Sequence, residues 1–225
     1  MADLFDTTLT VPATMATALL SDRTTGHRMT MQLWDQIEST VHRGARAHVG
    51  CLWRVTGIDP VAQTGTLLVR SSTAPTRKVP WAIQQDAAVT ELPETGATVD
   101  LTVTIAAMYT PMYDVPVEWR ENLKAGADGT ARPPGEGLSY RSKQVPVPSD
   151  RLQEWSVTKL KRLGVDGDVV AHAAPVVRIK GALVATAHLS VTGATVNDGL
   201  EQCVRTGIGK GRSYGLGLVA VTPRS

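Results

Sequence analysis

Residues 108–149 limit the architecture of this chain more than any other segment. Proline lacks a backbone N–H and clashes with the preceding helical turn, so a proline-rich stretch forms neither a continuous helix nor a central strand. We therefore predict an N-terminal domain (residues 1–107), a linker and long loop (108–149) and a C-terminal domain (150–225). The segment holds Pro111, Pro116, Pro133, Pro134, Pro146 and Pro148, with Gly126, Gly129, Gly135 and Gly137.

The sequence before this stretch predicts an α+β domain. Asp22 can cap a helix that runs to about Ser39, with apolar residues along one side. A second helix over 80–90 fits less well, because the segment is short and opens at Pro80. Alternating, β-branched residues predict strands at 7–11, 51–56, 66–71 and 98–106, the middle two forming a hairpin.

The sequence after it predicts a second α+β domain. Helices are expected at 150–163 and 195–206, strands at 168–179, 182–191 and 216–221, with a tight Lys180-Gly181 turn between the first two strands. The order of strands and helices favours two tandem ferredoxin-like (RRM-like) βαββαβ domains. This fold hosts many functions, so it does not by itself indicate one.

The composition and the first residues argue against a membrane protein and a secreted protein. No apolar run approaches the roughly 20 residues of a membrane span, and the first six residues carry two acids where a secretory signal is basic. Cys51 and Cys203 form no metal-type cluster and suit a reducing compartment. We expect a cytoplasmic protein without a membrane partner.

The strongest local motif is residues 207–217, Gly-Ile-Gly-Lys-Gly-Arg-Ser-Tyr-Gly-Leu-Gly. Such a loop lets the backbone approach a ligand closely, and its free N–H groups beside Lys210 and Arg212 could cradle phosphates. It is no dinucleotide fingerprint, because it follows a helix and opens a strand. A structural turn is the alternative. From Cys203 onward the chain carries cations and no acid, although its net charge is only +2.

In this context the glycine loop resembles the signature loop of the RAMP proteins, and more narrowly that of the CasE family, the crRNA-processing subunit of type I-E Cascade. Three further motifs occur in the family's order. They are Asp22-Arg-Thr-Thr-Gly-His27-Arg28 (family Asn/Asp-Pro-Tyr-x-x-His-Arg), Leu52-Trp53-Arg54-Val55 (Leu-Trp-Arg-Leu) and Glu154-Trp155 with Lys159 and Leu160 (Ala-Trp-Leu-x-x-Lys/Arg-Leu). Residues 57–97 and 107–138 have no match.

The resemblance implies an endoribonuclease that cleaves the CRISPR repeat hairpin through the 2′-hydroxyl and leaves a 2′,3′-cyclic phosphate. His27 falls at the family's catalytic histidine and Thr24 at its tyrosine; imidazole can move the proton this chemistry requires. No metal-ligand cluster accompanies them, so we expect neither metal nor cofactor. Expected RNA-binding residues are Arg28, Arg141, Lys143, Gly207, Gly209, Lys210, Gly211 and Arg212. Expected partners are the repeat stem-loop and other Cascade subunits, especially the backbone subunit.

Thr24 departs from the family pattern, because threonine cannot place a phenol at the scissile phosphate. Cleavage is then slower, the local alignment differs, or Tyr109, Tyr140 or Tyr214 takes over the role. The departure keeps a second function open, that of a hairpin-binding RAMP subunit with weak or no cleavage. A RAMP protein of another CRISPR subtype, or a ferredoxin-like protein that binds a small ligand, is the remaining alternative.

Overall fold

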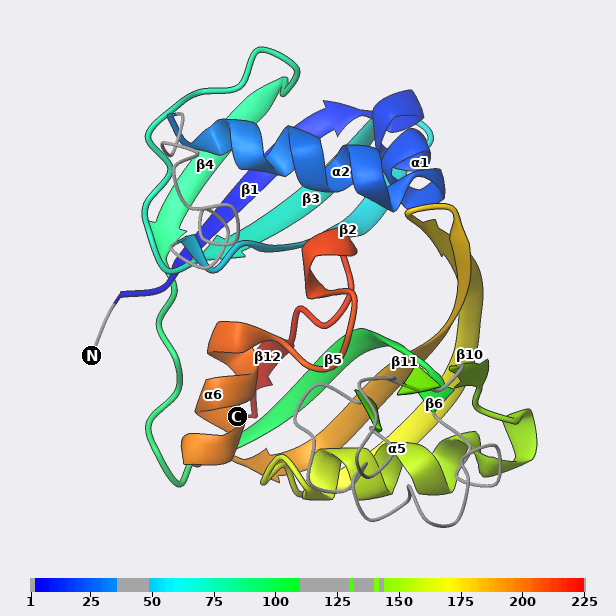
Figure 1. Ribbon diagram of the computed structural model, residues 1–225. Helices are drawn as coiled ribbons and strands as arrows, with labels where there is room; N and C mark the ends of the chain where they lie inside the picture. Colours follow the sequence, from blue (N-terminus) through cyan, green and yellow to red (C-terminus); the bar gives the residue numbers. More distant parts are fainter. Residues whose placement is uncertain (1–2, 36–48, 110–129, 132–139, 142–143, 225) are drawn as a thin grey trace.

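The computed structural model describes residues 3–35, 49–109, 130–131, 140–141 and 144–224. It is a mixed α/β structure built on two antiparallel four-stranded sheets, one in each half of the chain (Figure 1). Within the described residues, no helix is long and apolar enough to cross a membrane.

The N-terminal half carries the sheet β2-β3-β1-β4. Alternating side chains of β1, among them Leu9 and Val11, are fully buried with Trp53 of β2 and Leu67 of β3 in one core. Helix α1 covers this core through Leu19. The elements are β1 (Phe5–Pro12), α1 (Ala13–Ser21), α2 (Arg23–Thr30), η1 (Met31–Leu33), β2 (Leu52–Asp59), β3 (Thr64–Ser71) and β4 (Gln84–Val89).

The C-terminal half carries the sheet β10-β11-β5-β12, covered by α5 and α6. Leu160 of α5 and Leu200 of α6 pack with Ile105 and Leu189 in a second core. The elements are β5 (Thr98–Ala106), η4 (Ser149–Arg151), α5 (Leu152–Lys161), β10 (Asp168–Ile179), β11 (Ala182–Thr195), α6 (Asp198–Thr206), η5 (Arg212–Tyr214) and β12 (Ala220–Pro223).

The assignment of strand 98–106 to the N-terminal domain is wrong. This strand is β5, an inner strand of the second sheet that pairs with β11 on one side and β12 on the other. The fourth strand of the first sheet is β4, within the segment that fitted a helix poorly. Its sequence, Gln-Gln-Asp-Ala-Ala-Val, is mostly exposed at the sheet edge, so it lacks the apolar alternation that marks a half-buried strand.

The helix expected from Asp22 to about Ser39 is much shorter. Asp22 does cap α2, but the helix ends at Thr30, and a single 3-10 turn follows before the chain extends at Trp34. Ser39 lies outside the described residues. The preceding helix α1 escaped prediction because its run of Ala, Thr and Leu has no capping side chain at Pro12.

Much of the predicted linker 108–149 lies outside the described residues. Its described parts form two short antiparallel pairs. These are β6 (Met108–Tyr109) with β9 (Val145–Pro146), and β7 (Thr130–Ala131) with β8 (Tyr140–Arg141).

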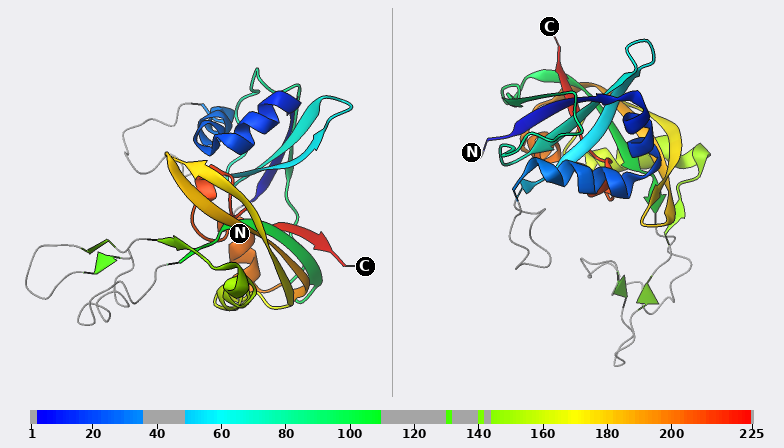
Figure 2. Two further views of the ribbon diagram at one scale, coloured as in Figure 1. Left: turned by 90° about the vertical axis from the view of Figure 1, so that its right-hand side faces the viewer. Right: turned by 90° about the horizontal axis from the view of Figure 1, so that it is seen from above.

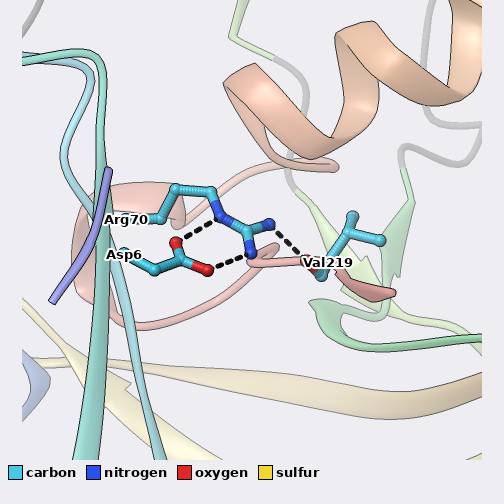
Figure 3. Close-up of polar contacts among 3 residues, drawn as sticks. All are labelled: Asp6, Arg70 and Val219. Carbon is cyan, nitrogen blue, oxygen red and sulfur yellow. Dashed lines mark hydrogen bonds and ion pairs between the residues drawn. The ribbon is translucent and has the colours of Figure 1, made fainter. Parts of the chain in front are cut away.

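Three features join the halves. The β10–β11 hairpin extends from the second sheet to the helices of the first half, where Asp22 and Arg178 form a parallel bridge (Figures 1 and 2). The glycine loop runs through the space between the two sheets. The third feature is Arg70 of β3, which binds Asp6 of β1 and donates a hydrogen bond of 2.6 Å to the carbonyl of Val219 (Figure 3).

Candidate functional site

The start of helix α2 is fixed by Asp22. Its Oδ1 accepts hydrogen bonds from the backbone N–H groups of Thr24 (3.0 Å) and Thr25 (3.2 Å), and the Thr25 hydroxyl donates to Oδ2 at 2.6 Å. These bonds, that of the Thr25 hydroxyl foremost, lower the pKa of Asp22. The cap sets the phase of the helix, so that Thr24 and His27, three residues apart, share one side.

His27 contacts a tyrosine from the other half of the chain. Its ring lies edge-on to that of Tyr214 in η5, with 5.7 Å between the centroids and 63° between the planes. Both side chains are partly accessible. An imidazole and a phenol, two groups able to exchange protons, thus meet where the halves join.

Tyr214 is held in place by the shape of the glycine loop. Gly211 and Gly215, at φ +80° and +72°, lie on either side of η5. The indole of Trp53 donates a hydrogen bond of 2.9 Å to the carbonyl of Ser213. A Cβ at Gly215 would lie 2.7 Å from Nη1 of Arg23 and 2.9 Å from the Trp53 ring, so glycine is required for the loop to pack this closely.

A third element reaches the same place. The backbone N–H of Lys180, in the turn between β10 and β11, donates to the Thr24 hydroxyl at 3.3 Å. The Lys180 ammonium lies 5.8 Å from the centroid of the Tyr214 ring. Lys180 has a φ of +48°, an uncommon value for a non-glycine residue. A cation therefore accompanies the imidazole and the phenol.

The other end of the glycine loop borders a groove of about 540 Å³ along α5. Gly209 lines it beside Lys159, whose ammonium lies 5.1 Å from the Trp155 ring centroid. Burial lowers the pKa of Lys159, and the nearby charges of Lys210 and Arg162 lower it further. Arg151 and one acid, Glu154, also line the groove. Concentrated positive charge beside a partly exposed aromatic ring suits a nucleic-acid strand.

The structure thus divides the predicted site residues between two places. His27 and Thr24 lie with Tyr214 and Lys180, whereas exposed Lys210 and Gly209 lie beside α5. Arg28 is exposed on α2 and donates to the Thr25 hydroxyl. Arg212 donates to the Thr206 carbonyl at 2.8 Å, which fastens the loop to the end of α6.

The structure says less about the other predicted RNA-binding residues. Gly207, Gly209 and Gly211 all have positive φ, as expected for this loop. Arg141 and Tyr140 belong to β8, whose side chains are not described, and Lys143 lies outside the described residues. Across the described ranges, no group of three or more His, Cys, Asp or Glu side chains gathers as a metal site would require.

Sequence reasoning missed Lys180, Arg151 and Arg162. The Lys180-Gly181 turn was expected. No local sequence pattern, however, predicts that this turn will contact Thr24 of helix α2, 156 positions away in the sequence. Tyr214 was one of three candidate tyrosines, and the contact with His27 singles it out from Tyr109, which lines the α5 groove instead.

No protein-family profile and no curated protein sequence matches the chain. Solved structures do. Thermus thermophilus Cse3, bound to an RNA representing a pre-cleavage complex, superposes with a TM-score of 0.68 at 16% identity, over 98% of this chain and 100% of that one. The CRISPR-associated protein Cas6e of Escherichia coli K-12 gives 0.60 at 16% identity, over 98% and 100%. A chain of a CRISPR RNA-guided surveillance complex in a pre-nicking state gives 0.56 at 14% identity, again over 98% and 100%. The chain therefore has the fold of these CRISPR proteins along its whole length.

Proposed function

We propose that this chain is a CasE-type endoribonuclease that binds the hairpin of CRISPR repeat RNA and cleaves it without a metal ion. The fold it shares with an RNA-bound Cse3 supports the class of substrate. The observation that carries the proposal is the contact between His27 and Tyr214, which puts two proton-transferring groups beside the Lys180 cation.

In the proposed reaction, His27 removes the proton from the 2′-hydroxyl as its oxygen bonds to the adjacent phosphorus. The bond from phosphorus to the 5′-oxygen breaks, and the phenol of Tyr214 gives its proton to that leaving oxygen. The Lys180 ammonium offsets the charge that builds on the phosphate. The products are a 2′,3′-cyclic phosphate and a 5′-hydroxyl, and exchange with water restores both side chains.

Tyr214 thus takes the place of the phenol that Thr24 cannot supply. The Thr24 hydroxyl accepts a hydrogen bond from the Lys180 amide, so it helps to position the turn that carries this cation. We assign Thr24 a positioning role beside His27 and Tyr214.

Two further parts of the proposal concern architecture and assembly. When the strands of each sheet are numbered in chain order, both sheets have the order 2-3-1-4, which is that of a ferredoxin-like domain. This order supports two such domains in tandem.

We also propose that the protein keeps its cleaved RNA and joins a Cascade-type complex through the backbone subunit, in the cytoplasm. The similarity to a chain of a surveillance complex supports this assembly.

The direct test incubates the purified protein with the CRISPR repeat RNA of its source genome in excess EDTA. We expect site-specific cleavage and a cyclic-phosphate end, detected by its resistance to phosphatase and to 3′-end ligation until acid opens the cyclic phosphate and a phosphatase then removes the monophosphate. Tight hairpin binding without cleavage would instead favour the alternative function, a subunit that binds the hairpin with weak or no cleavage. This alternative follows from Thr24, which stands where the family has a tyrosine.

Removing the Tyr214 hydroxyl with Tyr214→Phe should slow single-turnover cleavage about 10²-fold at unchanged hairpin affinity, because a positioned proton donor contributes about 10²–10⁴ in rate. An RNA with a 5′-thio leaving group at the scissile position needs no proton donor, so the variant should cleave it as fast as the wild type does. Tyr109→Phe, at the α5 groove, is the matched control and should behave as wild type. Equal slowing of both RNAs by Tyr214→Phe would remove the phenol from leaving-group protonation.

Lys159→Ala and Lys210→Ala should each weaken hairpin binding and flatten its salt dependence. Each phosphate neutralised contributes about 0.7–0.9 to the slope of log K against log salt. The exposed Lys78 of the N-terminal half provides the comparison, and Lys78→Ala should leave the slope unchanged. Binding isotherms between 50 and about 200 mM salt measure the effect. Unchanged slopes for both groove variants would mean that the RNA follows another surface.

A further inference from the structure

A cavity of about 550 Å³ lies between the two sheets, lined by residues of β2 from the first sheet and of β5, β10 and β11 from the second. Its lining combines arginines from the N-terminal half with hydroxyl groups and a histidine from the C-terminal half, and includes neither aspartate nor glutamate. The polar lining residues are Arg23, Arg54, Thr56, Thr102, Thr104, Thr186 and His188.

Arg23 is the most unusual of these residues. Only 7% of its surface is exposed, and its guanidinium is stacked 5.4 Å from the centroid of the Trp53 ring. Among the described residues it has no carboxylate partner, and its buried Nε has no acceptor. Burial lowers the pKa of Arg23, which expresses the cost of keeping this charge away from water.

Arg54, which belongs to β2, shares this feature with Arg23. Its Nε is also buried without an acceptor, and its hydrogen bond to the Thr102 hydroxyl is long, at 3.5 Å. Burial and then the charge of Arg70 lower the pKa of Arg54, while Asp6 acts in the opposite direction. That carboxylate already makes two 2.7 Å hydrogen bonds to Arg70, so both of its oxygens are in use.

Buried arginines in proteins are ordinarily paired, because a guanidinium without a partner destabilises the fold. Arg23 is buried and Arg54 partly buried, each with a buried Nε that has no acceptor, and the cavity lining holds no acid, so the lining suits an anion. Guanidinium groups bind phosphate oxygens with paired N–H donors, and the threonine hydroxyls of β5 supply further donors. A tetrahedral phosphate, with several oxygens to satisfy, matches this donor-rich lining better than a planar carboxylate.

We propose that this cavity binds a phosphate group between Arg23 and Arg54. Gly215 lines the same cavity and follows Tyr214 directly, so a phosphate bound there is next to the candidate active site. If the chain acts on RNA as proposed above, the phosphodiester that follows or precedes the scissile one is the natural occupant. Free inorganic phosphate is the other source of the same chemistry.

The test titrates the full-length protein with inorganic phosphate at constant ionic strength, replacing chloride, and follows binding by calorimetry and thermal unfolding. We expect saturable binding, with a melting temperature that rises with phosphate. Arg54→Met should weaken the binding at least tenfold. Because this variant also removes a partly buried charge whose nearest carboxylate, Asp6, is engaged by Arg70, its melting temperature without phosphate should equal or exceed that of the wild type. The second variant, Arg23→Lys, keeps a charge against Trp53 and should weaken binding as well.

Lys78→Met is the matched control, because Lys78 is an exposed cation of the N-terminal half that does not line the cavity, and it should bind phosphate as the wild type does. A hairpin RNA made uncleavable by a 2′-deoxy substitution then distinguishes the sources. Competition with phosphate assigns the cavity to the RNA backbone, and independent binding assigns it to free phosphate. Binding that never saturates, or that survives Arg54→Met and Arg23→Lys undiminished, overturns the proposal. Because no arm depends on cleavage, failure of the nuclease assay leaves this result intact.

Discussion

Replacing His27 with alanine is expected to lower the single-turnover rate of hairpin cleavage by about 10²–10⁴-fold, the usual contribution of a positioned proton-transfer group. One imidazole contributes little to phosphate binding compared with the Lys and Arg side chains, so hairpin affinity should stay within a few-fold. Quenched single-turnover assays and filter-binding isotherms on the same RNA measure the two effects separately.

His172→Ala is the appropriate control. His172 is exposed on β10, away from the Tyr214 contact, and its loss should change neither rate nor affinity. Normal cleavage by the His27 variant would exclude this imidazole from the reaction. Normal single-turnover cleavage with weakened binding would make it a recognition residue instead.

Arg70→Ala should cost about 3–5 kcal/mol in the free energy of unfolding. The Arg70 side chain is only 5% exposed and joins three groups, both oxygens of Asp6 and the Val219 carbonyl. Its removal leaves a largely buried carboxylate without its cation and a buried carbonyl without its donor, and breaking buried pairs in this way typically has such a cost. Urea unfolding monitored by tryptophan fluorescence measures it.

The matched comparison is Arg77→Ala. Arg77 pairs with Asp35 at 3.5 Å, with side chains 56% and 74% exposed. Exposed pairs contribute about 0–1 kcal/mol, so this variant should be nearly as stable as the wild type. In the double variant Arg70→Met/Asp6→Leu, part of the lost stability should return, because no uncompensated charge remains. Equal stability of the Arg70 and Arg77 variants would contradict the structural role given to Arg70.

The sequence predicted elements well where local rules decide them. The Asp22 cap, the β2–β3 and β10–β11 hairpins and the helices α5 and α6 follow from capping residues, turn glycines and apolar periodicity, and all are present. The family that the glycine-loop motif resembles is represented among the solved structures whose fold this chain shares.

What the sequence did not predict depends on tertiary contacts. Nothing local distinguishes β5 as a strand of the second sheet, because its partners β11 and β12 lie far along the chain. The candidate site shows the same limit. A motif predicted His27, but the contact of His27 with Tyr214 and the position of Lys180 depend on how the two halves pack together.

The hydrogen bond from Trp53 to Ser213 joins residues 160 positions apart. Contacts of such high sequence separation are closed only after the intervening chain has been ordered, since the entropy of loop closure opposes them. No fragment that holds only one sheet contains both His27 and Tyr214. The proposed cleavage therefore requires the assembled molecule, and a substitution that weakens the Trp53–Ser213 hydrogen bond is expected to abolish it while each sheet remains folded.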